Sequence, residues 1–242
     1  MDELSQYLFE PLWAEGEFVL SRSVRDAALA PLLVMAPALA QPAPESLQRL
    51  AHAYALREAL EPAWAACPLA LGPHQGRSTL VLADPGGEVL ARLVGQPWEV
   101  TPFLRVAIGL TVALGRLHAC GLIHKDVKPD NVLTNAATGD VWLTGFGIAS
   151  RLPRERQAPT PPEVIAGTLA YMAPEQTGRM NRSIDARSDL YALGITLYQM
   201  LTGSLPFTAA DPMEWVHCHV ARKPVPPGER LESVQRLSRR SS

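Results

Sequence analysis

One short stretch, residues 124–131, concentrates the side chains that could do chemistry, and it reads H-K-D-V-K-P-D-N. The carboxylate of Asp126 can accept a proton from a hydroxyl group, and the amine of Lys128 can neutralise charge on a phosphoryl oxygen. The side-chain amide of Asn131 can hold Mg²⁺. A base, a cation and a metal ligand within one loop indicate phosphoryl-transfer chemistry.

This stretch resembles the catalytic loop of protein kinases, which reads H-R-D-x-K-x-x-N. Residues 145–147 read G-F-G where kinases carry D-F-G, and residues 172–175 read M-A-P-E, similar to the kinase A-P-E motif. Kinases of the Ser/Thr type combine a catalytic-loop lysine with a threonine that precedes A-P-E. The resemblance therefore implies a Ser/Thr protein kinase domain with the catalytic residues Asp126, Lys128, Asn131 and Thr168, and with Asn131 as the metal ligand.

The same resemblance implies structural and nucleotide-binding roles for other positions. In kinases, the histidine of the loop packs in the core, and an aspartate that opens a long helix braces the loop. The structural set carried over from the family is His124, Phe146, Gly147, Glu175 and Asp189. The implied ATP contacts are Asp84, Gly86 and Leu133.

Two further segments are more specific: A-P-E-Q-T-G-R-M-N-R-S-I-D at 173–185 and D-P-M-E-W-V-H-C-H-V-A at 211–221. They resemble the kinase domain that opens large bacterial hybrid proteins, where an ATPase module and a sensor histidine kinase follow. The resemblance is strong over 103–227 and thin before it. Because the last residues do not resemble the family's continuation, the sequence favours a truncated product or a piece of a larger protein.

Several parts of the kinase nucleotide site are missing. Gly145 replaces the Mg²⁺-binding aspartate of D-F-G, and Met35 stands roughly where a strand lysine holds the α- and β-phosphates. No lysine precedes Lys125, and the partner glutamate of that lysine would fall near Ala53. Gly16 is the only glycine in the first 71 residues, so the Gly-rich loop is absent. We therefore expect impaired phosphoryl transfer, with degenerate positions at Met35, Ala53 and Gly145.

The secondary structure expected around these residues indicates an α+β, two-lobed, protein-kinase-like fold. A small strand-rich lobe is expected over 1–83, with strands at 17–20 and 79–83. Between these strands, Ser46 is expected to cap a helix. One face of that helix would carry Leu47, Leu50, Tyr54 and Leu60.

The turn sequence D-P-G-G at 84–87 predicts a hinge, followed by a helical large lobe over 88–227 and a tail of unclear structure over 228–242. The elements expected in the large lobe are an amphipathic helix over 103–117 that stops at Gly121, short strands at 132–133 and 141–143, and a buried helix over 188–202.

Composition excludes several classes of function. The 242 residues contain 22 basic and 24 acidic side chains, so no basic excess is available for nucleic-acid phosphates. The 47% hydrophobic and 19% charged content is typical of a globular chain with a core. The three cysteines lie far apart with no C-x-x-C, so neither a disulfide framework nor a zinc ribbon is expected. We predict a cytoplasmic protein.

An apolar run at 27–40 follows Arg22 and Arg25 and ends in A-x-A, as a signal peptide does. Cleavage after Ala40 and secretion would be the consequence. The acidic N-terminus and two prolines within the run favour a buried strand instead, and the run is too short for membrane insertion.

Two functions remain open. The first is a degenerate kinase that acts as an interaction module and binds nucleotide weakly, with a protein partner in a signalling pathway and no obligatory cofactor. The second is an active Ser/Thr kinase that uses ATP and Mg²⁺, with Asp126 as the base.

Overall fold

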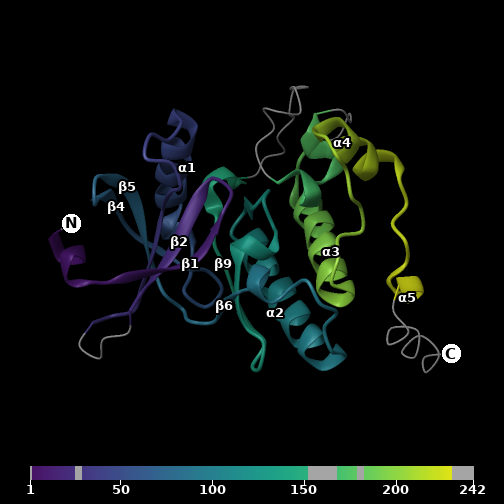
Figure 1. The fold of residues 1–242 in the computed structure, drawn as a ribbon, viewed down its shortest axis with the longest axis horizontal. Helices are drawn as coiled ribbons and strands as arrows, with labels where there is room; N and C mark the ends of the chain where they lie inside the picture. Colours follow the sequence, from purple (N-terminus) through teal and green to yellow (C-terminus); the bar gives the residue numbers. More distant parts are fainter. Residues whose placement is uncertain (1, 25–28, 152–167, 179–182, 231–242) are drawn as a thin grey trace.

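The computed structural model describes residues 2–24, 29–151, 168–178 and 183–230 of the chain. A strand-rich part, purple to blue in Figure 1, lies beside a helical part, teal to yellow. This is the two-lobed α+β architecture that the sequence predicts. The hinge expected at 84–87 lies between the last strand of the small lobe and the first strand of the large lobe.

The small lobe is built on a five-stranded antiparallel sheet in the order β1-β2-β3-β5-β4. Its strands are β1 (Phe9–Glu15), β2 (Phe18–Ser23), β3 (Leu32–Pro37), β4 (Pro68–His74) and β5 (Arg77–Ala83). The strands expected at 17–20 and 79–83 correspond to β2 and β5. The apolar run at 27–40 contains β3, the middle strand, which confirms the buried strand expected there.

The sequence does not reveal β1 and β4, and the reason is proline. Pro11 lies within β1, and Pro68 and Pro73 lie within β4, so neither segment shows a clear strand pattern. Proline lacks the N–H that a central strand needs, which confines it to edge strands and irregular positions. Both strands are the edges of this sheet, and both contain a register shift.

Helix α1 (Pro44–Ala55) packs beside this sheet and differs from its expected form. It begins at Pro44, because the fixed φ of proline suits the first turn of a helix. Ser46 is buried inside that first turn and caps nothing, so the expected Ser46 cap is wrong. Leu60 lies beyond the helix, after a short 3-10 turn, so its expected place on the helix face is also wrong.

The large lobe contains the elements that the sequence predicts, with small shifts at their ends. Its helices are α2 (Val100–Ala119), α3 (Ala186–Thr202), α4 (Pro212–Ala221) and α5 (Pro227–Arg230). A three-stranded sheet joins β6 (Glu88–Val89), β8 (Val132–Asn135) and β9 (Asp140–Leu143). Two more strands, β7 (Leu122–Ile123) and β10 (Ser150–Arg151), pair with each other. Short 3-10 helices are η1 (Asp2–Gln6), η2 (Arg57–Ala59), η3 (Leu90–Arg92), η4 (Pro129–Asn131), η5 (Phe146–Ile148), η7 (Leu169–Tyr171) and η8 (Pro174–Thr177).

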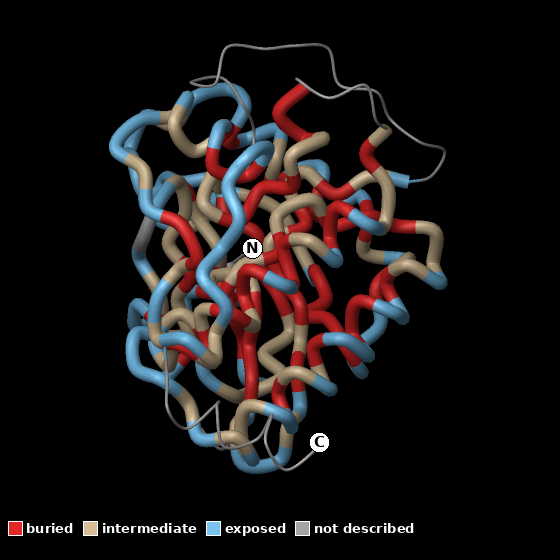
Figure 2. The backbone as a smooth tube through the Cα atoms, turned by 90° about the vertical axis from the view of Figure 1, so that its right-hand side faces the viewer, coloured by how far each residue is buried: buried red, intermediate tan, exposed pale blue. Residues whose placement is uncertain are grey.

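One continuous hydrophobic core crosses both lobes, and buried segments follow the interior of the molecule in Figure 2. Trp64, only 1% exposed, lies at the junction. Its carbonyl accepts a hydrogen bond from the amide of Leu143 at 2.8 Å, and the amide of Ala66 donates to the carbonyl of Leu143 at 2.9 Å. A small-lobe segment is therefore hydrogen-bonded to β9, which fixes the lobes relative to each other.

Among the described residues, only α2 has the length and apolar composition of a membrane span. Its buried face, which includes Leu110, Leu114 and Leu117, packs in the core of the large lobe. Only 28% of its apolar stretch is buried, and Leu104, Ile108 and Val112 on its other face are exposed. One such helix is weak evidence for a membrane span.

Candidate active site

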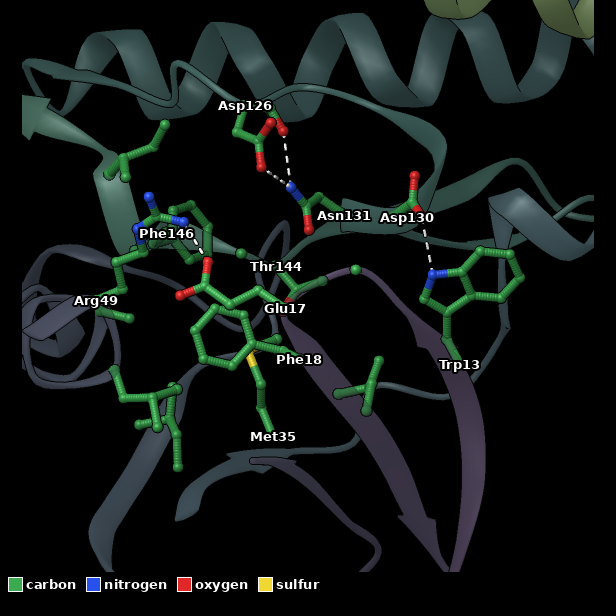
Figure 3. A pocket seen from close by; sticks show the side chains of 18 of the residues that line it. Trp13, Glu17, Phe18, Met35, Arg49, Asp126, Asp130, Asn131, Thr144 and Phe146 are labelled. Atoms are coloured by element: carbon green, nitrogen blue, oxygen red, sulfur yellow. Dashed lines mark hydrogen bonds and ion pairs between the residues drawn. The ribbon is translucent and has the colours of Figure 1, made fainter. Parts of the chain in front are cut away.

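A cavity of about 290 Å³ lies between the lobes, and the side chains that could do chemistry surround it. The turn between β1 and β2, the middle of β3 and helix α1 form its small-lobe side. The catalytic-loop residues and the segment 144–148 form its large-lobe side (Figure 3). Its volume is at the lower end of the range for small-molecule sites, about 300–1,000 Å³.

Asp189, fully buried at the start of α3, fixes the catalytic loop from below. Its carboxylate accepts hydrogen bonds from the backbone amides of His124 and Lys125, each at 2.8 Å, and contacts the ring of His118 at 2.8 Å. His124 is also fully buried, and its Nε2 lies 2.8 Å from the carbonyl of Thr144. Asp189 therefore holds two backbone amides of the loop and His124 lies in the core, while the roles that the resemblance implies for them stay predictions.

The four predicted catalytic residues meet around the carboxylate of Asp126. Its Oδ1 accepts a hydrogen bond from the amide of Thr168 at 3.2 Å. Its Oδ2 accepts one from Nδ2 of Asn131 at 2.9 Å and lies 3.2 Å from Nζ of Lys128. The Lys128 amine also donates to the hydroxyl of Thr168. The base position is therefore held by three donors from two chain segments.

At residue 145, the backbone adopts a left-handed conformation with φ of +77°. A Cβ atom added there would lie 2.3 Å from Oδ1 and 2.4 Å from Cγ of Asn131. The Asn131 side chain is held in that position by hydrogen bonds from its Nδ2 to the carbonyl and the carboxylate of Asp126. Asn131 thus fills the space where a side chain at position 145 would begin.

The remaining motif residues lie close to these groups. Phe146 is 2% exposed, and its ring centroid lies 5.0 Å from that of His124. Gly147 faces helix α1 at close range, since a Cβ there would lie 3.0 Å from Cβ of Arg49. Glu175 accepts a hydrogen bond from the hydroxyl of Ser188 at 2.5 Å, which gives it a partner in the large lobe.

Comparison with known proteins identifies the fold. The family model of the protein kinase domain matches residues 90–238. The chain belongs to the protein kinase family. The match covers the large lobe from residue 90 and all four predicted catalytic residues, whereas residues 1–89, which include the whole small lobe, lie outside it. It extends to residue 238, so the expectation that the resemblance ends at 227 is wrong.

Curated bacterial Ser/Thr kinases are similar to the chain over somewhat less than two thirds of its length. The chain is 36% identical over 157 residues, 64% of its length, to serine/threonine-protein kinase PknB of Mycobacterium tuberculosis. It is 38% identical over 161 residues, 65% of its length, to serine/threonine-protein kinase Pkn1 of Myxococcus xanthus. These stretches are only 25% and 23% of the two relatives, so the chain spans about a quarter of the length of the kinases it matches.

The donor set of the cavity fits the Mg²⁺ site of a kinase only in part. Mg²⁺ requires oxygen ligands in near-octahedral geometry. Gly145 offers no side-chain oxygen, whereas Asn131 donates through Nδ2 to Asp126 and keeps Oδ1 as an oxygen donor. Oδ1 of Asp130 accepts a hydrogen bond from the indole of Trp13 at 2.8 Å. Within the described part of the chain, no group of three or more His, Cys, Asp or Glu residues could hold a metal.

Two of the predicted degenerate positions lie in the cavity wall on the small-lobe side. Met35, in β3, pairs with Leu20 of β2 and Leu80 of β5. Ala53, in α1, is 6% exposed. Both line the cavity and give it apolar surface at the two positions where the resemblance to kinases implies an ion pair.

The predicted ATP contacts lie elsewhere. The carboxylate of Asp84 pairs with Arg22 at 2.7 Å and accepts a hydrogen bond from the amide of Gly86 at 2.9 Å. Asp84 and Gly86 line a different cavity, at the edge of the small-lobe sheet. Leu133 is fully buried in β8. None of the three is among the residues that line the interlobe cavity, and their ATP-binding role stays a prediction.

Two contacts across the cavity were missed by the sequence reasoning. Arg49 of α1 forms an ion pair with Glu17, next to the β1–β2 turn, and Trp13 of β1 binds Asp130 of the catalytic loop (Figure 3). A signal for the first contact was available. Arg49 precedes Ala53 by one helical turn, so both lie on the face of α1 that looks into the cavity.

His219 of α4 holds the segment that follows Thr168 in the chain. Nε2 of His219 lies 2.7 Å from the carbonyl of Leu169, and Nδ1 lies 2.8 Å from the hydroxyl of Tyr191. Burial lowers the pKa of His219 from its usual value. Burial, with a smaller effect of Glu175, raises the pKa of Tyr191 to about 12. A neutral histidine therefore accepts from Tyr191 and donates to Leu169.

Proposed function

We propose that this chain is a degenerate Ser/Thr protein kinase domain that acts as an interaction module and binds nucleotide weakly. The observation that carries the proposal is Asn131, which fills the space above Gly145 and bonds to Asp126. Phosphoryl transfer depends on positioning and on cations that neutralise developing charge. Gly145 and Met35 both line this cavity. Under the resemblance to kinases, Gly145 stands at the position of the metal-binding aspartate and Met35 roughly at that of the strand lysine.

The size of the effect expected for each missing group supports a low rate of phosphoryl transfer. Loss of one preorganised charge-stabilising group costs about 10²–10³-fold in rate, and here two such groups are absent. The intact geometry around Asp126 is consistent with this proposal, because those contacts also hold the catalytic loop in place. Under the resemblance to bacterial hybrid proteins, the partner is a protein in a cytoplasmic signalling pathway.

An active Ser/Thr kinase is the second candidate. It is favoured by the arrangement of Asp126, Lys128 and Thr168, in which the base is held between a cation and a backbone amide. Asp126 would then accept the proton of the substrate hydroxyl, and Lys128 would lie beside the phosphoryl oxygens.

The experiment that separates the two candidates measures transfer of radiolabelled γ-phosphate from MgATP to the chain itself and to a generic acceptor protein. The matched control is Asp126→Asn, which keeps the shape of the base and removes its charge. We expect no transfer above that of the Asp126→Asn variant. Mg²⁺-dependent transfer that this substitution abolishes would establish the active kinase instead.

A further inference from the structure

Arg49 and Glu17 form an ion pair inside the interlobe cavity, and both side chains are only 31% exposed. Arg49 comes from helix α1, whereas Glu17 follows the turn at Gly16 between β1 and β2. In Figure 3 the two side chains point toward one another in front of Phe146. The pair therefore bridges the helix and the hairpin at the side of the cavity that faces the segment 145–148.

The cations that line the cavity differ in how many contacts other side chains make with them. Among the described residues that line it, the cations are Arg49 and Lys128. Lys128 is held by Asp126 and Thr168 of its own lobe. Arg49 contacts the carboxylate of Glu17 through Nη1, which carries two of the five N–H groups of a guanidinium. The Glu17 carboxylate lies beside a turn and is partly solvated.

The base of the Arg49 side chain lies against the segment 145–149, which contacts α1 at two positions. Gly147 approaches within 3.0 Å of Arg49 Cβ, measured from the position of an added Cβ. One turn further along, Nε2 of His52 lies 2.6 Å from the carbonyl of Ala149. Helix α1 is thereby held against the segment 145–149, and the guanidinium is directed into the cavity from a rigid support.

We propose that Arg49 is the phosphate-binding cation of this cavity and that Glu17 occupies its anion position until a nucleotide polyphosphate displaces it. The inference rests on the proposed weak nucleotide binding. A guanidinium suits phosphate because its planar fork donates two parallel hydrogen bonds, as it does to a carboxylate. Helix α1 thus supplies the cation through Arg49, whereas Met35, which β3 contributes to the cavity lining, is neutral. Neutralisation by Arg49 requires no metal ion.

Calorimetric titration of the chain with ATP, with adenosine and with inorganic tripolyphosphate, all in the presence of EDTA, tests the proposal. We expect Glu17→Gln to bind ATP about three- to tenfold more tightly, because the competing anion is removed. Arg49→Gln should weaken ATP binding at least about tenfold, the loss typical of a hydrogen bond to a charged group. Adenosine, which lacks phosphates, should bind all variants alike, and tripolyphosphate should follow ATP.

Two controls separate the phosphate role from general effects. In the double variant Glu17→Gln/Arg49→Gln, the gain from Glu17→Gln should vanish, because Arg49 is no longer present to be released from Glu17. Arg57→Gln removes the same charge from a residue outside the cavity lining, which pairs with the exposed Glu58, and should leave ATP affinity unchanged. Thermal melts of each variant verify that it folds.

The outcomes distinguish this inference from the proposed function. If Arg49→Gln weakens ATP and adenosine equally, Arg49 has a structural role only, and the inference is wrong while weak nucleotide binding stands. If neither ligand binds any variant, the inference is overturned and the interaction module remains. Metal-dependent γ-phosphate transfer would contradict the proposed function, whereas the ratio of ATP to adenosine affinity would still decide the role of Arg49.

Discussion

A Cβ atom at position 145 would lie 2.3 Å from Oδ1 of Asn131, so Gly145 and the present position of Asn131 depend on each other. We expect Gly145→Ala to lower the free energy of unfolding by about 2–5 kcal/mol, from left-handed backbone strain and the collision together. Chemical denaturation of the two proteins measures the difference.

A matched glycine separates these two costs. Gly121 has a φ of +72° and open space around its Cβ position, so Gly121→Ala should cost only the backbone strain of about 1–2 kcal/mol. In an Asn131→Ala background, the cost of Gly145→Ala should fall to the same level. Equal costs for the two alanine variants in the wild-type background would show that Asn131 does not fill the space.

The buried carboxylate of Asp189 should be the most sensitive support of the catalytic loop. Asp189→Asn replaces one acceptor oxygen by an N–H group that faces a buried donor, and we expect a loss of about 2–3 kcal/mol in the free energy of unfolding. Asp211→Asn is the control, because Asp211 caps α4 at an exposed position and asparagine caps equally well. A loss at Asp189 no greater than at Asp211 would contradict the bracing role.

His219 should make stability depend on pH. Its pKa is lowered in the folded chain, so the unfolded chain binds the proton more readily. Stability is therefore full above the unfolded pKa of about 6.5, and it should fall as the pH drops through that value toward the folded pKa. Urea unfolding at about pH 7.5 and pH 5.5 measures the change.

The variant His219→Gln identifies the source of that slope. Glutamine has a donor and an acceptor but does not titrate, so the part of the slope that His219 contributes should disappear even if the variant is less stable. An unchanged slope in the variant would assign the pH dependence to other groups.

The hydrogen bond between Trp13 and Asp130 should couple the β1 strand to the catalytic loop. A double-mutant cycle with Trp13→Phe and Asp130→Ala isolates the pair, and we expect a coupling free energy of about 0.5–1.5 kcal/mol from a partly exposed bond to a charged acceptor. The measurement is equilibrium unfolding of the four proteins. Additive losses would mean that the bond does not hold the two lobes together.

Much of the large lobe follows from sequence alone, because its signals are local. The periodic apolar residues of α2, the glycine after its end and the motif around Asp126 each lie within one short segment. The sequence also determined that no lysine precedes Lys125, since an absent residue type needs no structure to be seen. The central strands β2, β3 and β5 were recognisable for the same reason, whereas the proline-containing edge strands were not.

Only the tertiary structure decided which side chains meet in and around the interlobe cavity. Arg49 and Glu17 are 32 residues apart, and Trp13 and Asp130 are 117 apart, so neither pairing has a periodic signal. Such contacts depend on how α1 and the β1–β2 hairpin close over the large lobe. The position of Asn131 above Gly145 is likewise a consequence of packing, since the absence of a side chain is visible in the sequence but the group that fills its space is not.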